Sequence, residues 1–191
     1  MYLKFSLQSL ICFVFPPCFF KNWLLNKMGW NISRNCRLGF SWVYAGHVTL
    51  NNNSSIGHGN FVSVDSISLS EDSYIGHVNR VTGPFYVYLM RRAAIGNSNK
   101  IKRARKPIVW GHAILKLGEQ SKLTVGHLVD CTRSVKIGRN SIIAGQGSQL
   151  WTHGYLHAPE GGGRFRIDGS ISIGNNVYIG SACVFNAGVR V

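Results

Sequence analysis

The stretch from Ile143 to Val191 decides the fold; it reads IAGQGSQLWTHGYLHAPEGGGRFRIDGSISIGNNVYIGSACVFNAGVRV. Large apolar residues recur in it at every sixth position, at Ile167, Ile173, Ile179, Phe185 and Val191. A helix repeats about every 3.6 residues and a strand every 2, so neither produces this spacing. A six-residue repeat predicts a short strand plus a turn, with successive coils stacked into a solenoid of parallel strands.

The same step runs through most of the chain. It is marked by pairs of an aliphatic residue and glycine at Leu38-Gly39, Ile56-Gly57, Ile75-Gly76, Ile95-Gly96, Leu117-Gly118 and Ile137-Gly138. Repeats from about residue 36 onward make roughly seven coils of about 18 residues, with two insertions. We therefore expect an all-β protein whose main domain spans residues 36–191, preceded by an apolar segment over residues 1–35.

Asparagine recurs four positions after three of the inward isoleucines, at Asn60, Asn79 and Asn99. If these residues share one face of successive coils, their amides can stack into a hydrogen-bonded ladder. The alternative is that each is an independent turn residue in the left-handed conformation that asparagine tolerates well. Either role concerns stability and not chemistry.

Composition restricts the compartment and the partners. The 191 residues hold 21 Lys and Arg against 7 acidic residues, a formal charge of +14. This excess of positive charge favours one of three kinds of binding partner: a polyanion, an anionic membrane surface, or a phosphorylated ligand such as coenzyme A. The five cysteines are odd in number and form no CxxC, which argues against a disulfide framework or a zinc ribbon and favours a reducing compartment.

The first 30 residues are apolar and aromatic, with Lys4, Lys21 and Lys27 scattered through them and Pro16-Pro17 dividing them. The run from Leu10 to Phe15 is shorter than the roughly 20 residues that span a bilayer. We expect two short helices that cap the open end of the solenoid. A compatible alternative is that they lie in the membrane interface, with aromatic side chains inserted and lysines at the headgroups.

The densest positive run lies at the middle of the chain and holds Arg91, Arg92, Lys100, Lys102, Arg103, Arg105 and Lys106. We interpret it first as a solvated face, and second as a site for an anionic membrane or a phosphate of the substrate. Nucleic acid ranks last, because no aromatic side chains are interleaved to make a stacking platform.

Two segments carry a resemblance to a known family: Thr152-His153-Gly154, and IGNNVYIG at residues 173–180. They resemble the active-site stretch of the hexapeptide-repeat acyltransferases, in the branch that acetylates sugars. The resemblance implies a left-handed parallel β-helix, acetyl-CoA as acyl donor, and a sugar or lipid-linked glycan as acceptor. It further implies a homotrimer acting in surface polysaccharide synthesis, in the cytoplasm or peripherally at the inner face of the cell membrane.

Within this resemblance His153 is the general base that takes the proton of the acceptor hydroxyl, a task that suits imidazole. The glycine-rich stretch after it is expected to be a loop that closes over a groove. The acceptor side is expected at Trp151, Asp130, His157 and Tyr178, and the donor side at Gly180, Ser181 and Asn186. Tyr178 stands where the family usually has tryptophan. Asp130 lies near the place of a family asparagine.

Two other functions remain open at this stage. The chain ends at Val191, before the further coils that complete the donor channel in the family, so it is either truncated or a non-catalytic binding scaffold with an exposed, aggregation-prone last coil. The five Gly-His pairs are best interpreted as exposed turns, but His127, His153 and His157 are candidates for a zinc site like that of γ-class carbonic anhydrases. We expect no metal, because no carboxylate partner is evident from the spacing.

Overall fold

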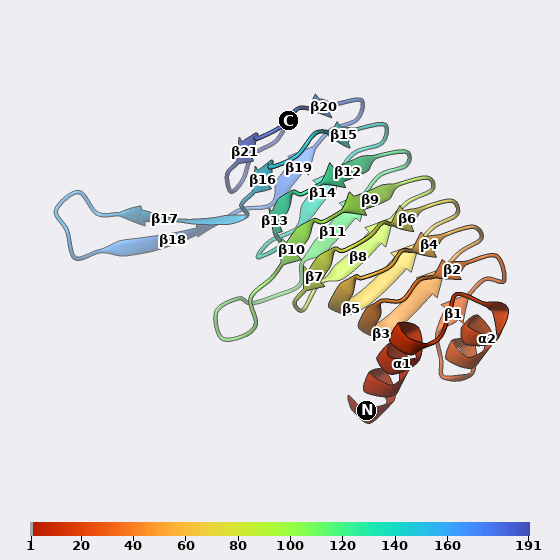
Figure 1. Cartoon of the computed structure of the whole chain (residues 1–191). Helices are drawn as coiled ribbons and strands as arrows, with labels where there is room; N and C mark the ends of the chain where they lie inside the picture. The colour runs from red at the N-terminus through yellow and green to blue at the C-terminus, as the bar shows by residue number, and fades with distance from the viewer. Residues whose placement is uncertain (1) are drawn as a thin grey trace.

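A computed structural model describes residues 2–191 and shows a three-sided parallel β-helix closed at one end by two helices (Figure 1). The all-β solenoid predicted from the six-residue repeat is confirmed. The first face is a seven-stranded sheet, one strand per coil, made of β2 (Arg37–Leu38), β4 (Ser55–Ile56), β6 (Tyr74–Ile75), β9 (Ala94–Asn97), β12 (Lys122–Val125), β15 (Ile142–Ile143) and β20 (Tyr178–Ile179).

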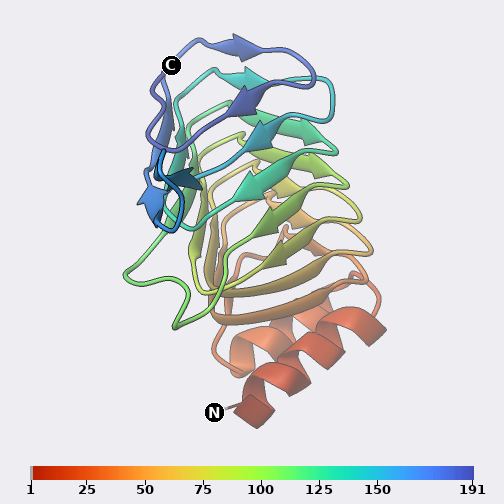
Figure 2. The same ribbon diagram turned by 90° about the vertical axis from the view of Figure 1, so that its left-hand side faces the viewer.

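The other two faces form one twelve-stranded sheet that bends along its length. Two long strands run round the bend, β3 (Trp42–Leu50) and β5 (Phe61–Leu69). The second face continues with β7 (Arg80–Thr82), β10 (Lys100–Lys102), β13 (Leu128–Asp130), β16 (Gln149–Leu150) and β21 (Val184–Phe185). The third face holds β1 (Asn31–Ile32), β8 (Tyr86–Leu89), β11 (Ile114–Leu117), β14 (Val135–Ile137) and β19 (Ile171–Ile173). Figure 2 shows the coils stacked on one axis.

Apolar residues in register form the core. On the first face Ile75 pairs with Ile56 on one side and Ile95 on the other, and all three are at most 1% exposed. Burying each such side chain contributes about 1.5–3 kcal/mol. Glycine follows each of these isoleucines because the next coil passes close to the backbone. A Cβ atom on Gly57 would clash with the carbonyl of Gly76, and a Cβ atom on Gly96 would clash with the carbonyl of Thr124.

The predicted asparagine ladder is confirmed and is longer than expected. Asn79 Nδ2 donates to Asn60 Oδ1 over 3.0 Å, and Asn99 Nδ2 donates to Asn79 Oδ1 over 3.1 Å. The column includes every coil: Ser41, Asn60, Asn79, Asn99, His127, Ser148 and Cys183. The backbone N–H of each member after Ser41 donates to the side chain one coil below. The left-handed backbone conformation occurs at the residue before each asparagine of the ladder, as at Val78 and Ser98, and not at Asn60, Asn79 or Asn99 themselves.

The N-terminal helices pack against the first strands of the prism. α1 (Tyr2–Val14) packs on β3, and α2 (Phe19–Lys27) packs on β1. Lys21, expected to lie at lipid headgroups in the membrane-interface interpretation, is fully buried instead. Within residues 2–191, no helix has the length and apolar character needed to cross a membrane.

Two insertions leave the prism at the corner where the second face turns into the third. We call this the insertion corner; it comprises residues 103–113, 131–134 and 151–170. The second insertion is an antiparallel hairpin of β17 (His153–His157) and β18 (Arg164–Asp168), which projects from the body in Figure 1. The glycine-rich stretch at residues 160–163 is a turn, as expected, but the segments on either side of it are paired strands and not loop. Ile167 is also not an inward repeat position, because it lies in the hairpin and is 42% exposed, and the core resumes at Ile171.

Candidate active site

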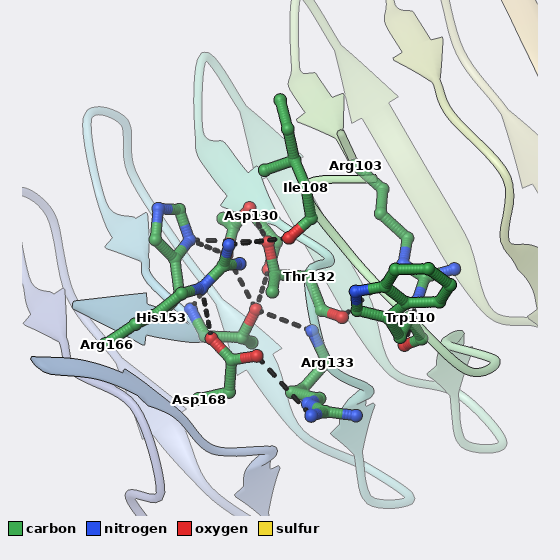
Figure 3. Close-up of polar contacts among 10 residues, drawn as sticks. Arg103, Ile108, Trp110, Asp130, Thr132, Arg133, His153, Arg166 and Asp168 are labelled. Atoms are coloured by element: carbon green, nitrogen blue, oxygen red, sulfur yellow. Dashed lines mark hydrogen bonds and ion pairs between the residues drawn. The ribbon is translucent and has the colours of Figure 1, made fainter. Parts of the chain in front are cut away.

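His153 and Asp130 meet at the insertion corner from neighbouring coils. Asp130 ends β13, and Val129 on that strand pairs in register with Leu150 of β16. Three residues after Leu150 the chain reaches His153 at the start of the hairpin. This stacking brings side chains 23 positions apart to a distance of 2.8 Å between His153 Nδ1 and Asp130 Oδ2 (Figure 3).

The carboxylate of Asp130 is 3% exposed, and several donors surround it. Thr132 Oγ1 donates to Oδ1 over 3.0 Å, while Thr152 Oγ1 and Thr152 N donate to Oδ2 over 2.6 and 3.2 Å. A buried charge is stable when donors of this kind replace its water. The backbone N–H of Arg133 in turn donates to Thr152 Oγ1 and fixes that hydroxyl.

These contacts set the tautomer of His153. Thr132 has one hydroxyl proton and gives it to Asp130, so its oxygen, 3.3 Å from His153 Nδ1, is an acceptor there. Nδ1 therefore carries the proton, and the lone pair lies on Nε2. Figure 3 shows the Nε2 edge turned away from Asp130, and the side chain is 29% exposed. The arrangement is that of a general base oriented by a carboxylate.

Two aromatic rings lie close to the imidazole. The Trp151 centroid lies 6.3 Å from that of His153 and the Tyr155 centroid 6.4 Å from it, both nearly perpendicular to it. Gln149 accepts the indole N–H over 2.9 Å, and the Lys102 ammonium lies 5.6 Å from the indole centroid. The sequence interpretation named Trp151 as a substrate contact and missed Tyr155, although alternation along a strand that starts at His153 would place Tyr155 on the same face.

The hairpin is fastened to the first insertion by a chain of charged contacts. Arg166 donates to Asp168 over 2.7 Å and to the carbonyl of Ile108 over 2.7 Å, and Arg133 lies 3.4 Å from the same aspartate (Figure 3). No pattern in the sequence indicates these pairings, because they join residues up to 58 positions apart.

Arg103 departs from the solvated face predicted for the basic run. It is 6% exposed and donates to the carbonyls of Thr132, Trp110 and Gly111, so it ties the first insertion to the strand turn behind His153. Burial lowers the pKa of its guanidinium, partly offset by Asp65. Two other members of the run form surface ion pairs, Arg91 with Glu119 and Arg92 with Asp72.

Of the other predicted residues, Asp130 contacts His153 but lies buried behind the imidazole and not at the surface. His157 is exposed on the hairpin opposite Arg164. Asn186 follows Phe185, the register partner of Leu150, and so lies at the insertion corner one coil beyond Trp151. The others lie elsewhere on the last coil: Tyr178 is 74% exposed on the first face, and Gly180 and Ser181 turn from the first face to the second.

The zinc alternative requires His127 together with His153 and His157. His127, expected at the surface, is 1% exposed, and both ring nitrogens are engaged, Nε2 with Thr124 Oγ1 and Nδ1 with Ser148 N. No group of three or more metal-binding side chains occurs in the part of the chain that the structure describes.

A separate groove of about 810 Å³ lies further down the insertion corner and does not include His153. Its lining includes Trp42, Tyr44, Asp65, Arg105, Lys106 and His112. The first insertion forms one of its walls and also accepts the hydrogen bond from Arg166, so this one segment touches both the groove and the hairpin of His153.

The chain matches no protein-family model and no curated protein sequence. Its structure is similar to the crystal structure of the polySia-specific acetyltransferase NeuO, with a TM-score of 0.38 and 16% sequence identity. The match covers 84% of this chain and 64% of the length of that protein.

Proposed function

We propose that the protein is an acyltransferase that uses His153 as general base to acetylate a sugar hydroxyl with acetyl-CoA. The observation that carries the proposal is the 2.8 Å contact from His153 Nδ1 to a buried carboxylate, with Nε2 facing outward. Transfer from a thioester to a hydroxyl needs such a base together with close placement of the two substrates.

In the proposed reaction Nε2 of His153 takes the hydroxyl proton as the oxygen attacks the thioester carbonyl. Asp130 stabilises the imidazolium that forms, because its charge lies next to Nδ1–H and is already held by Thr132 and Thr152. Collapse of the tetrahedral intermediate breaks the carbon–sulfur bond, and the imidazolium returns its proton to the leaving thiolate. No covalent acyl-enzyme is required.

The walls of the site favour a sugar acceptor. Trp151 and Tyr155 offer ring faces and edges against which the apolar C–H surface of a sugar packs, and Tyr155 is 50% exposed. Arg105 and Lys106 in the nearby groove supply positive charge for an acidic glycan or a phosphate of a lipid-linked one.

The proposal is tested by incubating candidate glycans with acetyl-CoA and measuring the mass increase of acetylation. His153→Ala is expected to lower the rate by about two to four orders of magnitude, because a positioned general base contributes that much. His157→Ala is the matched control, since this exposed histidine lies on the same hairpin strand, and it is expected to retain most of the activity. Equal acetylation by wild type and His153→Ala would contradict the proposal and favour a binding scaffold.

A further inference from the structure

The first helix turns its apolar face outward. Leu3, Leu7, Leu10 and Val14 are spaced as one stripe of a helix and are 84%, 49%, 49% and 57% exposed. The opposite side, against the prism, buries Ile11 and Cys12 and also the polar Gln8 and Ser9, which are at most 1% exposed. A cap that faced only water would not place a continuous stripe of leucine and valine on its outer side.

The second helix shows the same inversion. Lys21 and Asn22 are buried, at 0% and 4% exposure, whereas Phe19, Phe20 and Trp23 are 61%, 54% and 44% exposed. If nothing bound to this helix, its largest apolar side chains would stay in contact with water. The arrangement also requires that a lysine lose its hydration on folding.

The buried polar groups fasten the two helices to the end of the prism. Lys21 Nζ lies 2.7–3.0 Å from the carbonyl oxygens of Cys12, Phe15, Leu38 and Gly39, which share its three N–H donors. Asn22 donates to the carbonyl of Cys36, and Ser9 Oγ lies 2.8 Å from the carbonyl of Val43. These polar contacts add to apolar packing on the inner side, where Ile11, Cys12 and Leu25 belong to the buried core, while the apolar residues on the outer side remain exposed.

The outward side chains meet where the helices join. The ring of Phe20 lies 6.4 Å from that of Phe15 and stacks on Trp23 at 5.7 Å, and the Lys27 ammonium lies 5.9 Å from the indole centroid. We call this surface the cap patch; it comprises Leu3, Leu7, Leu10, Phe13, Val14, Phe15, Phe19, Phe20 and Trp23. Figure 2 shows both helices together at one end of the stack.

The charge around the cap patch identifies the occupant. Residues 1–64 contain no Asp or Glu. Lys4, Lys27, Arg34 and Arg37 at this end are all exposed. Exposed leucine, phenylalanine and tryptophan side chains flanked by cations match the interface of an anionic bilayer.

We propose that the cap patch binds the surface of an anionic lipid bilayer, with the outward side chains of α1 and α2 inserted among the headgroups. The attraction has two parts: burial of exposed apolar area, and Coulomb attraction of the flanking cations to lipid phosphates. Neither part depends on His153, so the proposal stands apart from the acyltransferase reaction.

The test is sedimentation of the full chain with vesicles of phosphatidylglycerol and, separately, of phosphatidylcholine. We expect at least about tenfold stronger binding to the anionic vesicles, weakened by salt. The double substitution Phe20→Ser/Trp23→Ser is expected to lower that binding by about tenfold or more. The matched control Phe61→Ser/Tyr74→Ser removes two rings that are 43% and 39% exposed on the sides of the prism, and it is expected to bind as the wild type does.

Thermal unfolding of both variants shows whether they are folded. Wild-type binding by a folded Phe20→Ser/Trp23→Ser, or an equal loss in the control, would overturn the proposal. Pairing of the cap patch with a second copy of the chain would also overturn the proposal. The protein would then be a dimer that does not bind vesicles, and the Phe20→Ser/Trp23→Ser variant would be a monomer.

Discussion

Asp130 shows how a residue can be found from the sequence while its role is not. The family resemblance places it among the acceptor contacts, and spacing along the chain offers no reason to pair it with His153. The structure puts it 3% exposed behind the imidazole, bonded to Thr132, Thr152 and His153. The pairing depends on how far neighbouring coils are offset, which a sequence repeat of about 18 residues does not determine.

His127 provides a prediction about pH. Burial lowers the pKa of its imidazole below the usual 6.5, with the carbonyl of Ile143 partly opposing. Its Nδ1 accepts from Ser148 N, and protonation would destroy that hydrogen bond. As pH falls through 6.5 the unfolded chain binds the proton before the folded chain does, so the free energy of unfolding should decrease.

Urea unfolding between about pH 7.5 and pH 5 checks this expectation. The variant His127→Asn keeps a polar side chain at the same position of the column and should show a flatter dependence over this range. An unchanged slope in the variant would mean that other groups cause the acid sensitivity.

At the scale of elements, the side-chain column is the clearest agreement between sequence and structure. Three asparagines, each four positions after an inward isoleucine, predict this column, because identical residues at a constant spacing make a repeat recognisable in the sequence. Ser41, His127, Ser148 and Cys183 escape recognition as members, since they differ in chemistry while making the same backbone contact.

Removing the middle of this column should be costly. Asn79 donates to Asn60 and to the carbonyl of Gly96, and it accepts from the backbone and side chain of Asn99. Asn79→Ala leaves these buried partners unsatisfied and is expected to lower the free energy of unfolding by about 2–4 kcal/mol. Asn52→Ala, on an exposed turn, should change it by less than about 0.5 kcal/mol. Comparable losses in denaturant titrations of the two variants would refute the role of the column.

The hairpin of β17 and β18 is the element that the six-residue periodicity fails to predict. Ile167 falls on the six-residue step by coincidence, and the glycine-rich stretch is typical of a loop. The five residues His153–His157 read HGYLH and show no alternation of apolar and polar side chains, so the sequence does not indicate this strand. Contacts that hold the hairpin, such as Arg166 to Ile108, are visible only in three dimensions.

For the whole molecule, the sequence predicts a capped solenoid, and the structure adds which side of the cap faces outward. Composition alone shows that residues 1–30 are apolar with a few lysines. It does not show that Lys21 lies inside and that Phe20 and Trp23 lie outside. With a spacing of about 4.8 Å between coils, the candidate site lies about 20 Å along the axis from the cap.

Stacking of coils therefore creates the site, because neither Asp130 nor His153 has the other as a sequence neighbour. If they act as one unit, their substitutions will not be additive. Asp130→Asn should lower kcat/KM by about two orders of magnitude, since the imidazole loses the group that fixes its tautomer.

The most direct test is a double-mutant cycle on kcat/KM, measured as thiol released from acetyl-CoA in the presence of an acceptor glycan. We predict that the double variant Asp130→Asn/His153→Ala is no slower than His153→Ala alone. A double variant slowed by the product of the two single effects, or a His153→Ala variant as fast as the wild type, would contradict a base and carboxylate that work as one unit.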